Sequence, residues 1–180
     1  MLRTTSAREA ILPAVALTFL RQALKKEAGA LGATHALHGA GFATGDEILK
    51  EFRRLLAHES AESLEQKSFW KRLSGFFSNR GWGSFTHERV HPGMAILTSD
   101  DWMEADESGS EAQPGCAFTC GVLANVLSTL ADGPIAVLEV SCRSRGDASC
   151  QFLFGAEEAV HEVYGHLLEG ATLERALKRT

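Results

Sequence analysis

The sequence predicts an α+β fold, in which an N-terminal helical hairpin and further helices pack on a small antiparallel sheet made of two β-hairpins. The main observation is the order of the segments, which runs helices, hairpin, helix, hairpin, helix and is typical of helices on an antiparallel sheet. The second is size, because 180 residues with 44% hydrophobic content suffice for one domain with a sizeable core. We therefore expect a single domain over 1–180, with the helical hairpin at 1–58 and the remaining elements at 59–180.

The composition excludes two classes of partner. The net charge is −5, with acidic and basic residues interspersed, so no basic surface is expected for nucleic acid or anionic lipid. The longest apolar run near the N-terminus, ILPAVALTFL, has ten residues, whereas a membrane-spanning helix needs about 20. We therefore expect a cytoplasmic protein with reduced thiols, no nucleic-acid partner and no membrane span.

Apolar residues at helical spacing predict the first arm of the N-terminal hairpin. This helix is expected at 6–28, with Ser6 as its candidate N-cap. Pro13 also suits the first turn of a helix that starts later. Gly29 and Gly32 follow and are expected to end the helix.

The second helix is expected at 34–57 and contains Gly39, Gly41 and Gly45. Each glycine inside a helix costs about 1 kcal/mol relative to alanine, so their presence needs a reason. Glycines at this spacing let either another backbone or a ligand approach closely, and the sequence leaves both interpretations open.

Four strands and three further helices complete the predicted fold. In chain order, we expect a helix at 63–78, strands at 84–90 and 94–98, a helix at 116–130, strands at 135–141 and 149–154, and a helix at 157–168. The tail to Thr180 either extends the last helix or frays. The acidic segment at 99–115 is expected to be a long mobile loop.

All four cysteines of the chain fall between residues 116 and 150. Cys116 opens the predicted fourth helix, and Cys142 and Cys150 flank the loop of the second hairpin. Glu139 stands in an otherwise apolar strand, where a carboxylate is costly to bury unless it is paired or binds a cation. Thiolates and a carboxylate that converge predict a tetrahedral metal site, for which zinc is the favoured ion.

The predicted site needs an irregular strand. Glu139 and Cys142 are three residues apart and would point to opposite faces of an ideal strand, so the strand must bend or end by Ser141. Four protein ligands leave no open position for a catalytic water, so we expect a structural zinc. Cys120 lies one helical turn after Cys116 and is either a spare ligand or a plain buried thiol.

The spacing of the four candidate metal ligands resembles that of a known family. The pattern C-x22-E-x2-C-x7-C joins the four candidate ligands, with Gly121 in the helix and Gly146 in the hairpin. It resembles the 4-vinyl reductase domain, in particular the version that senses aromatic compounds in bacterial phenol-responsive activators. The helical hairpin is also similar to vesicle-tethering subunits of the TRAPP complex. The resemblance implies that Cys116, Glu139, Cys142 and Cys150 bind zinc, and that a hydrophobic molecule binds in a buried pocket nearby.

Aromatic residues gather at 69–82, and they are either ordinary core or the wall of a ligand pocket. The pocket of the resembled family lies between these helices and the sheet, so we expect a buried cavity bounded by the second helix, the third helix and the first hairpin. Its expected ligand-binding residues are Gly41, Phe42, Gly45, Phe69, Trp70, Phe77, Trp82, Ile96 and Phe118. Ile96 stands where the phenol sensors have a pocket tryptophan, so the resemblance implies a bulkier or more aliphatic ligand than phenol.

We expect a stand-alone, zinc-containing, sensor-type domain that binds a hydrophobic ligand and signals to a separate partner protein, because no output module is attached. One alternative is a vinyl reductase, or its accessory protein, in chlorophyll synthesis, but no nicotinamide or flavin motif is present to supply the hydride. The other alternative is a TRAPP-like assembly subunit, which an exposed apolar face on the first two helices would favour. We also expect a homodimer formed through the N-terminal helices.

Overall fold

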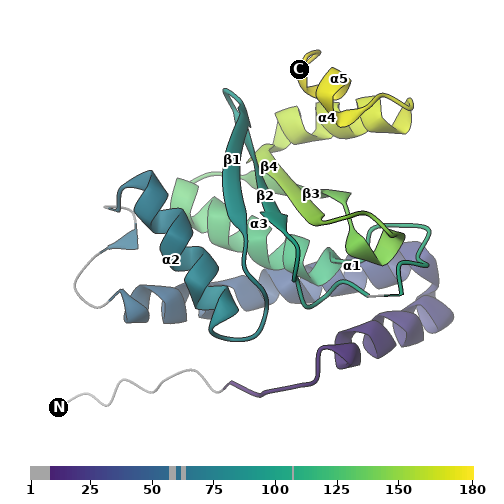
Figure 1. Cartoon of the computed structure of the whole chain (residues 1–180), viewed down its shortest axis with the longest axis horizontal. Helices are drawn as coiled ribbons and strands as arrows, with labels where there is room; N and C mark the ends of the chain where they lie inside the picture. The colour runs from purple at the N-terminus through teal and green to yellow at the C-terminus, as the bar shows by residue number, and fades with distance from the viewer. Residues whose placement is uncertain (1–8, 57–59, 62–63, 107) are drawn as a thin grey trace.

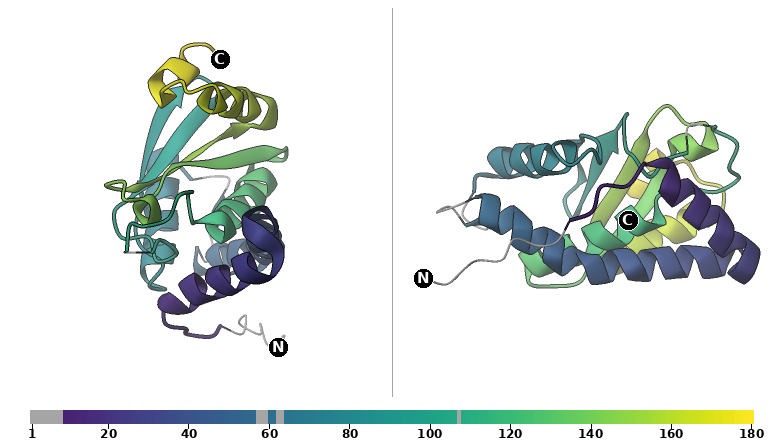
Figure 2. Two further views of the ribbon diagram at one scale, coloured as in Figure 1. Left: turned by 90° about the vertical axis from the view of Figure 1, so that its right-hand side faces the viewer. Right: turned by 90° about the horizontal axis from the view of Figure 1, so that it is seen from below.

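The computed structural model describes residues 9–56, 60–61, 64–106 and 108–180. As predicted, it is an α+β fold with helices packed on a small antiparallel sheet. The elements are α1 (Val15–Leu55), α2 (Gln66–Ser78), β1 (Thr86–His91), β2 (Met94–Ser99), α3 (Ala117–Ala131), β3 (Ile135–Ser141), the 3-10 turn η2 (Arg143–Arg145), β4 (Cys150–Ala156), α4 (Glu157–Leu168) and α5 (Leu173–Leu177). Figure 1 shows α4 and α5 above the sheet and α3 and α1 below it, and the turned view on the left of Figure 2 shows the same layers.

The two hairpins join into one four-stranded sheet. The strand order is β1-β2-β4-β3, so β2 and β4 pair antiparallel in the centre and β3 forms one edge. Leu97 and Phe152 are register partners in the larger apolar cluster, which the sheet shares with α1, α2 and α3. Ile96 and Leu153 are the adjacent partners and belong to the second cluster, which α4 and α5 cover. The alternation of side chains along each strand thus supplies both faces with apolar residues.

Helix α1 consists of two arms that meet at Gly29, where the backbone has φ 73° and ψ 171°. A side chain would strain this conformation, which explains why the predicted break occurs at a glycine. The second arm follows at once, so Gly32 lies inside it and does not end a helix, contrary to the sequence prediction. The first arm begins at Val15, shortly after Pro13. The predicted N-cap Ser6 and the predicted boundaries at 57–59 and 63 lie outside the described residues.

Glycines bring the second arm of α1 into contact with α3. A Cβ built on Gly41 would lie 2.0 Å from the carbonyl oxygen of Phe118, and one on Gly121 would lie 2.0 Å from that of His38. A Cβ on Gly45 would lie 2.4 Å from a side-chain oxygen of α3. Gly41 and Gly45 therefore accommodate another helix, so of the two interpretations that the sequence left open, the structure supports close helix packing.

Two segments are more closely packed than the sequence predicts. Trp102 and Glu104 are each 2% exposed, so the acidic segment that was expected to be a mobile loop contributes to the core. The C-terminal tail turns at Gly170, where φ is +85°, and forms α5. Ala176 of α5 is buried in the second apolar cluster. The tail therefore neither extends α4 nor frays.

Candidate metal centre and ligand pocket

Three thiols and one carboxylate meet at the end of the sheet nearest the start of α3. Cys116 precedes α3, Glu139 lies on β3, Cys142 follows β3, and Cys150 begins β4. One ligand atom from each lies within 4.8 Å of the others, and all four side chains are buried. The sequence prediction that these four residues come together therefore agrees with the geometry.

The sulfur positions suit a tetrahedral metal. Sγ of Cys116 lies 4.0 Å from Sγ of Cys142 and 3.9 Å from Sγ of Cys150. Zinc–thiolate bonds of about 2.3 Å place tetrahedral sulfurs about 3.8 Å apart. A disulfide needs about 2.05 Å, and the cysteines are free. The thiols are thus spaced for a shared cation.

A bulge in β3 turns both of its ligands to the same place. The register with β4 shifts between Glu139 and Ser141, and a bulge of this kind redirects the side chains that follow it. Cys142 follows the strand. A hydrogen bond from its backbone N–H to Oδ2 of Asp147, 2.8 Å long, holds it in position. The spacing of Glu139 and Cys142 required β3 to bend or end by Ser141, and this bend is present.

Glu139 has one satisfied oxygen and one free oxygen. It is 8% exposed, and its Oε2 accepts the N–H of Cys116 at 2.8 Å. Its buried Oε1 has no hydrogen-bond partner among the described residues. A buried carboxylate oxygen without a partner is costly, and a metal bound by this oxygen would remove the cost.

The pKa values of the clustered acids shift in different directions. Burial, followed by the charge of Cys142, raises the pKa of Glu139. Hydrogen bonds to Cys142 and Cys150 raise the pKa of Cys116, while hydrogen bonds from Cys116 first, and then from Cys150, lower the pKa of Cys142. Without a cation, one thiolate therefore forms at the expense of the other groups. A divalent ion would allow all four to ionise together, since ligand deprotonation and metal binding are coupled.

Cys120 is separate from the cluster of candidate ligands. It is 7% exposed on the next turn of α3, and burial raises the pKa of its thiol. It lines a pocket that Glu139 also lines. The four side chains that converge do not include it.

The start of α3 is held by the acidic segment. The Glu104 carboxylate accepts the N–H of Phe118 at 2.9 Å, the N–H of Thr119 at 2.8 Å and the hydroxyl of Thr119 at 2.6 Å. Trp102 Nε1 donates to the same hydroxyl at 2.6 Å. Burial raises the pKa of Glu104 to about 7, against the effect of these hydrogen bonds. Sequence reasoning missed this capping role, although an aromatic residue within a polar segment (DDWMEA) was a signal of burial.

Arg21 ties the first arm of α1 to the loop before Cys116. It is 4% exposed, and its Nη1 donates to the carbonyl oxygens of Gly115 at 2.9 Å and Glu104 at 3.2 Å. Its Nε and Nη2 have no hydrogen-bond partner among the described residues. Sequence reasoning also missed this residue, because an arginine on an amphipathic helix is usually solvent-exposed.

The expected pocket residues lie in several different places. Phe69, Trp70, Phe77, Trp82 and Phe118 pack in or against the larger apolar cluster, and their rings meet at centroid distances such as 4.9 Å for Phe69 and Trp70 and 5.4 Å for Phe77 and Trp82. Phe42 is 44% exposed. Ile96 lies on the opposite face of the sheet, under α4, because it alternates with Leu97 along β2. These aromatic side chains therefore fill the region in which a cavity was expected.

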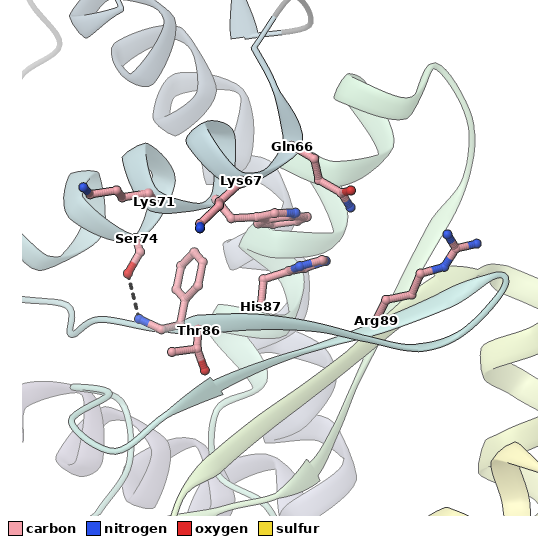
Figure 3. A pocket seen from close by; sticks show the side chains of 9 residues that line it. Gln66, Lys67, Lys71, Ser74, Thr86, His87 and Arg89 are labelled. Atoms are coloured by element: carbon pink, nitrogen blue, oxygen red, sulfur yellow. Dashed lines mark hydrogen bonds between the residues drawn. The ribbon is translucent and has the colours of Figure 1, made fainter.

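A groove of about 520 Å³ runs between α2 and β1. Figure 3 shows Lys67 and Lys71 on its α2 side and His87 and Arg89 on β1. The ring of His87 stacks on Trp70 at 4.3 Å. Of the expected pocket residues, Trp70 lines this groove. Most of its lining residues are exposed or half-buried, unlike the walls of the buried cavity that the sequence predicted.

A larger pocket of about 850 Å³ lies beside the candidate metal centre. Both arms of α1, the loop before Cys116, the start of α3, the edge strand β3 and the end of α4 contribute to it. Its walls include the aliphatic residues Leu31, Ala33, Leu37, Val137, Leu138, Leu167 and Leu168, and Glu139 also lines it. None of the expected pocket residues is among its lining residues.

The fold and the buried cluster define an α+β domain with a Cys3Glu group between one helix and one hairpin. Residues 96–156 match the family model of the 4-vinyl reductase domain, and all four clustered residues fall within this segment. The match confirms the resemblance that the cysteine and glutamate spacing indicated. No curated protein matches the chain.

Solved structures share the fold at low sequence identity. The phenol-responsive sensory domain of the transcription activator PoxR, solved with phenol, is 18% identical, with a TM-score of 0.70 over 93% of this chain and 84% of that one. A vinyl-4-reductase family protein from Methanocaldococcus jannaschii is 18% identical, with a TM-score of 0.53 over 82% of each chain. A trafficking protein particle complex subunit 3 from Naegleria fowleri, covalently bound to palmitic acid, is 15% identical, with a TM-score of 0.62 over 79% of this chain and 91% of that one.

The helices of the described ranges do not meet the requirements of a membrane span. None of them combines the length and the apolar character that crossing a bilayer requires.

Proposed function

We propose that this protein is a sensor-type domain that binds one zinc ion and one hydrophobic small molecule. The observation that supports the proposal is the pocket of about 850 Å³, which shares Glu139 with the Cys3Glu cluster. Small-molecule sites typically measure about 300–1,000 Å³ and are mostly apolar with a few polar groups. The likeness to a phenol sensory domain agrees with this function.

The zinc ion would be structural. Cys116, Glu139, Cys142 and Cys150 supply a complete tetrahedral shell, and thiolates favour zinc over magnesium or calcium. Bound there, zinc would join the start of α3 to both strands of the second hairpin. It would also fix Glu139, and through it one wall of the ligand pocket.

The ligand would be more aliphatic than phenol, although its site differs from the one that the sequence suggested. The apolar part of the pocket lining is mainly aliphatic, with Tyr164 beside it. A bound ligand would contact both arms of α1 together with β3 and α4. Its presence would thereby influence the angle at Gly29, which offers a route for a signal to a separate partner protein.

Native mass spectrometry of freshly purified protein, followed by a thermal-shift screen of hydrophobic compounds, tests this function. We expect one zinc per chain, and a rise in melting temperature of about 5–10 °C at a ligand concentration near 100 times Kd. Thr34→Trp, which places a large side chain at the pocket rim, should abolish the rise. His35→Trp is the matched control, since His35 is exposed on the same helix and lies outside the lining. If no compound raises the melting temperature of the zinc-loaded protein, the ligand-binding function is wrong.

A second role, self-association through the first arm of α1, is favoured by a separate observation. Val15, Phe19 and Leu20 of this arm are 52%, 63% and 47% exposed. Val15 and Phe19 are one helical turn apart, so they lie on the same face. An exposed apolar face on these helices is the feature expected of an assembly subunit, and we propose that a second copy of the chain covers it. The two-fold contact would be isologous.

A further inference from the structure

The pocket beside the metal centre has a polar end, which Arg21, Lys25 and Glu111 form, next to its aliphatic walls. Further polar residues also line the pocket, namely Thr34, His38, Gln113, Glu139, Arg145 and Tyr164. Arg21 is held in place through Nη1 by two backbone carbonyl oxygens, those of Gly115 and Glu104. Its guanidinium therefore has a fixed position, and its remaining donors have fixed directions.

Two donors of Arg21 have no acceptor. Nε and Nη2 are buried and lack a hydrogen-bond partner among the described residues. The nearest carboxylate oxygens are Oε1 of Glu111, 3.7 Å from Nε, and Oδ2 of Asp106, 3.8 Å from Nη2. Both distances are longer than those of hydrogen bonds. A buried donor without a partner is unfavourable, so a ligand oxygen that accepts from Arg21 would gain affinity.

Glu111 supplies a hydrogen-bond acceptor near Nε of Arg21. Its backbone N–H donates to the carbonyl oxygen of Ser144 at 2.9 Å, which anchors the residue. Its Oε2 accepts from Lys25, so Oε1 remains on the side of Arg21. One end of the pocket thus offers a donor and an acceptor side by side. A hydroxyl group can accept a hydrogen bond from the donor and donate one to the acceptor.

The charges at this end argue against an anionic head group. Arg21 and Lys25 carry two positive charges, and Asp106 and Glu111 carry two negative ones, so the four groups balance. Elsewhere in the lining, Glu139 adds an acidic group, and Arg145 adds a basic one that pairs with Asp147. A ligand carboxylate at Arg21 would lie against Glu111, whereas a neutral hydroxyl adds no charge.

We propose that the ligand of this pocket is an aliphatic molecule with a neutral hydroxyl head group. Its oxygen accepts a hydrogen bond from Arg21 Nε, and its proton is donated to Glu111 Oε1. The aliphatic walls enclose the chain. This inference rests on the proposed ligand-binding function and adds the chemistry of the head group.

Three probes of equal chain length test the head group by isothermal titration of the zinc-loaded full chain. They are 1-decanol, its isomer nonyl methyl ether, which accepts a hydrogen bond but cannot donate one, and decanoate. We expect 1-decanol to bind about tenfold more tightly than the ether, which is the effect of one hydrogen bond to a charged group. Decanoate should bind more weakly than 1-decanol. Equal binding of 1-decanol and the ether, or tighter binding of decanoate, overturns the hydroxyl inference and leaves a hydrophobic-ligand domain in place.

Variants assign the effect to the two side chains. Arg21→Lys should reduce the affinity for 1-decanol about tenfold. Because Arg21 also supports the fold, Glu111→Gln provides an independent measurement on a side chain that is 19% exposed. It should reduce the preference for 1-decanol over decanoate about tenfold, while Glu47→Gln, on the exposed surface of α1, should leave it unchanged. A preference that survives Glu111→Gln overturns the inference, and failure of all three probes to bind overturns it together with the proposed function.

Discussion

Cys120 and Cys142 are both buried free thiols, yet the structure surrounds them differently. Cys142 accepts the N–H of Gly115 at 3.2 Å and lies 4.0 Å from the sulfur of Cys116. Cys120 lies among pocket residues, outside the four that converge. The surroundings thus distinguish Cys142, a candidate metal ligand, from Cys120, a thiol that is buried but lies outside the cluster.

Cys142→Ala and Cys150→Ala should each lower the zinc content well below one equivalent and lower the melting temperature by about 10 °C or more. The reason is that zinc binding is coupled to folding, so the loss exceeds the roughly 0.5–3 kcal/mol of an ordinary core substitution. Cys120→Ala is the control and should keep its zinc with a much smaller change. Elemental analysis and differential scanning calorimetry measure both quantities, and equal behaviour of the three variants would refute the assignment of ligands.

At the scale of residues, the sequence identified the candidate metal ligands but not all of the buried residues around them. The four clustered residues are identifiable because metal ligands are restricted to a few side chains at a fixed spacing. The burial of Trp102, Glu104 and Arg21 depends on partners far along the chain, such as Thr119 and Gly115. Local composition describes such residues as loop or surface, so sequence alone could not place them.

At the scale of elements, the packing of α1 on α3 depends on small residues at the contact. Gly41→Ala would place a Cβ 2.0 Å from the Phe118 carbonyl oxygen, and forcing the two backbones apart should cost about 1–3 kcal/mol or more. Gly39→Ala meets no atom within 4 Å, and should stabilise the helix by about 0.5–1 kcal/mol. Chemical denaturation measures the two free energies of unfolding. Destabilisation by both substitutions, or by neither, would contradict the close packing described for α1 and α3.

Most elements were predictable, and the exceptions have physical causes. The strands and α4 follow from clear periodicity, and the turn at Gly29 follows from a glycine after a helical segment. The partner of Gly41 and Gly45 was not predictable, because the same glycines suit a ligand or another helix. The expected pocket was therefore placed beside α2, whereas the larger of the two described pockets is lined by residues of α1, the start of α3, β3 and α4.

At the scale of the whole molecule, the exposed apolar face of the first arm predicts a dimer. Light scattering at tens of micromolar should report a dimer for the unmodified protein and a monomer for Phe19→Asp, because a buried aromatic anchor typically contributes at least about 2 kcal/mol to an interface. Gln66→Asp changes an exposed polar position on α2, away from this face, and serves as the control. A monomeric unmodified protein at this concentration would rule out the dimer.

The position of β3 at the edge of the sheet has a consequence for the protein without its ligand. Residues 137–140 line the pocket, and among the described strands β3 pairs with β4 alone. The outer edge of such a strand presents N–H and C=O groups that an extended segment of another chain can pair with. Under the proposed function, a ligand that fills the pocket would cover this part of the strand, and an empty pocket would leave it accessible. Under the proposed function, the supply of the small molecule would therefore also protect the protein against aggregation by strand addition.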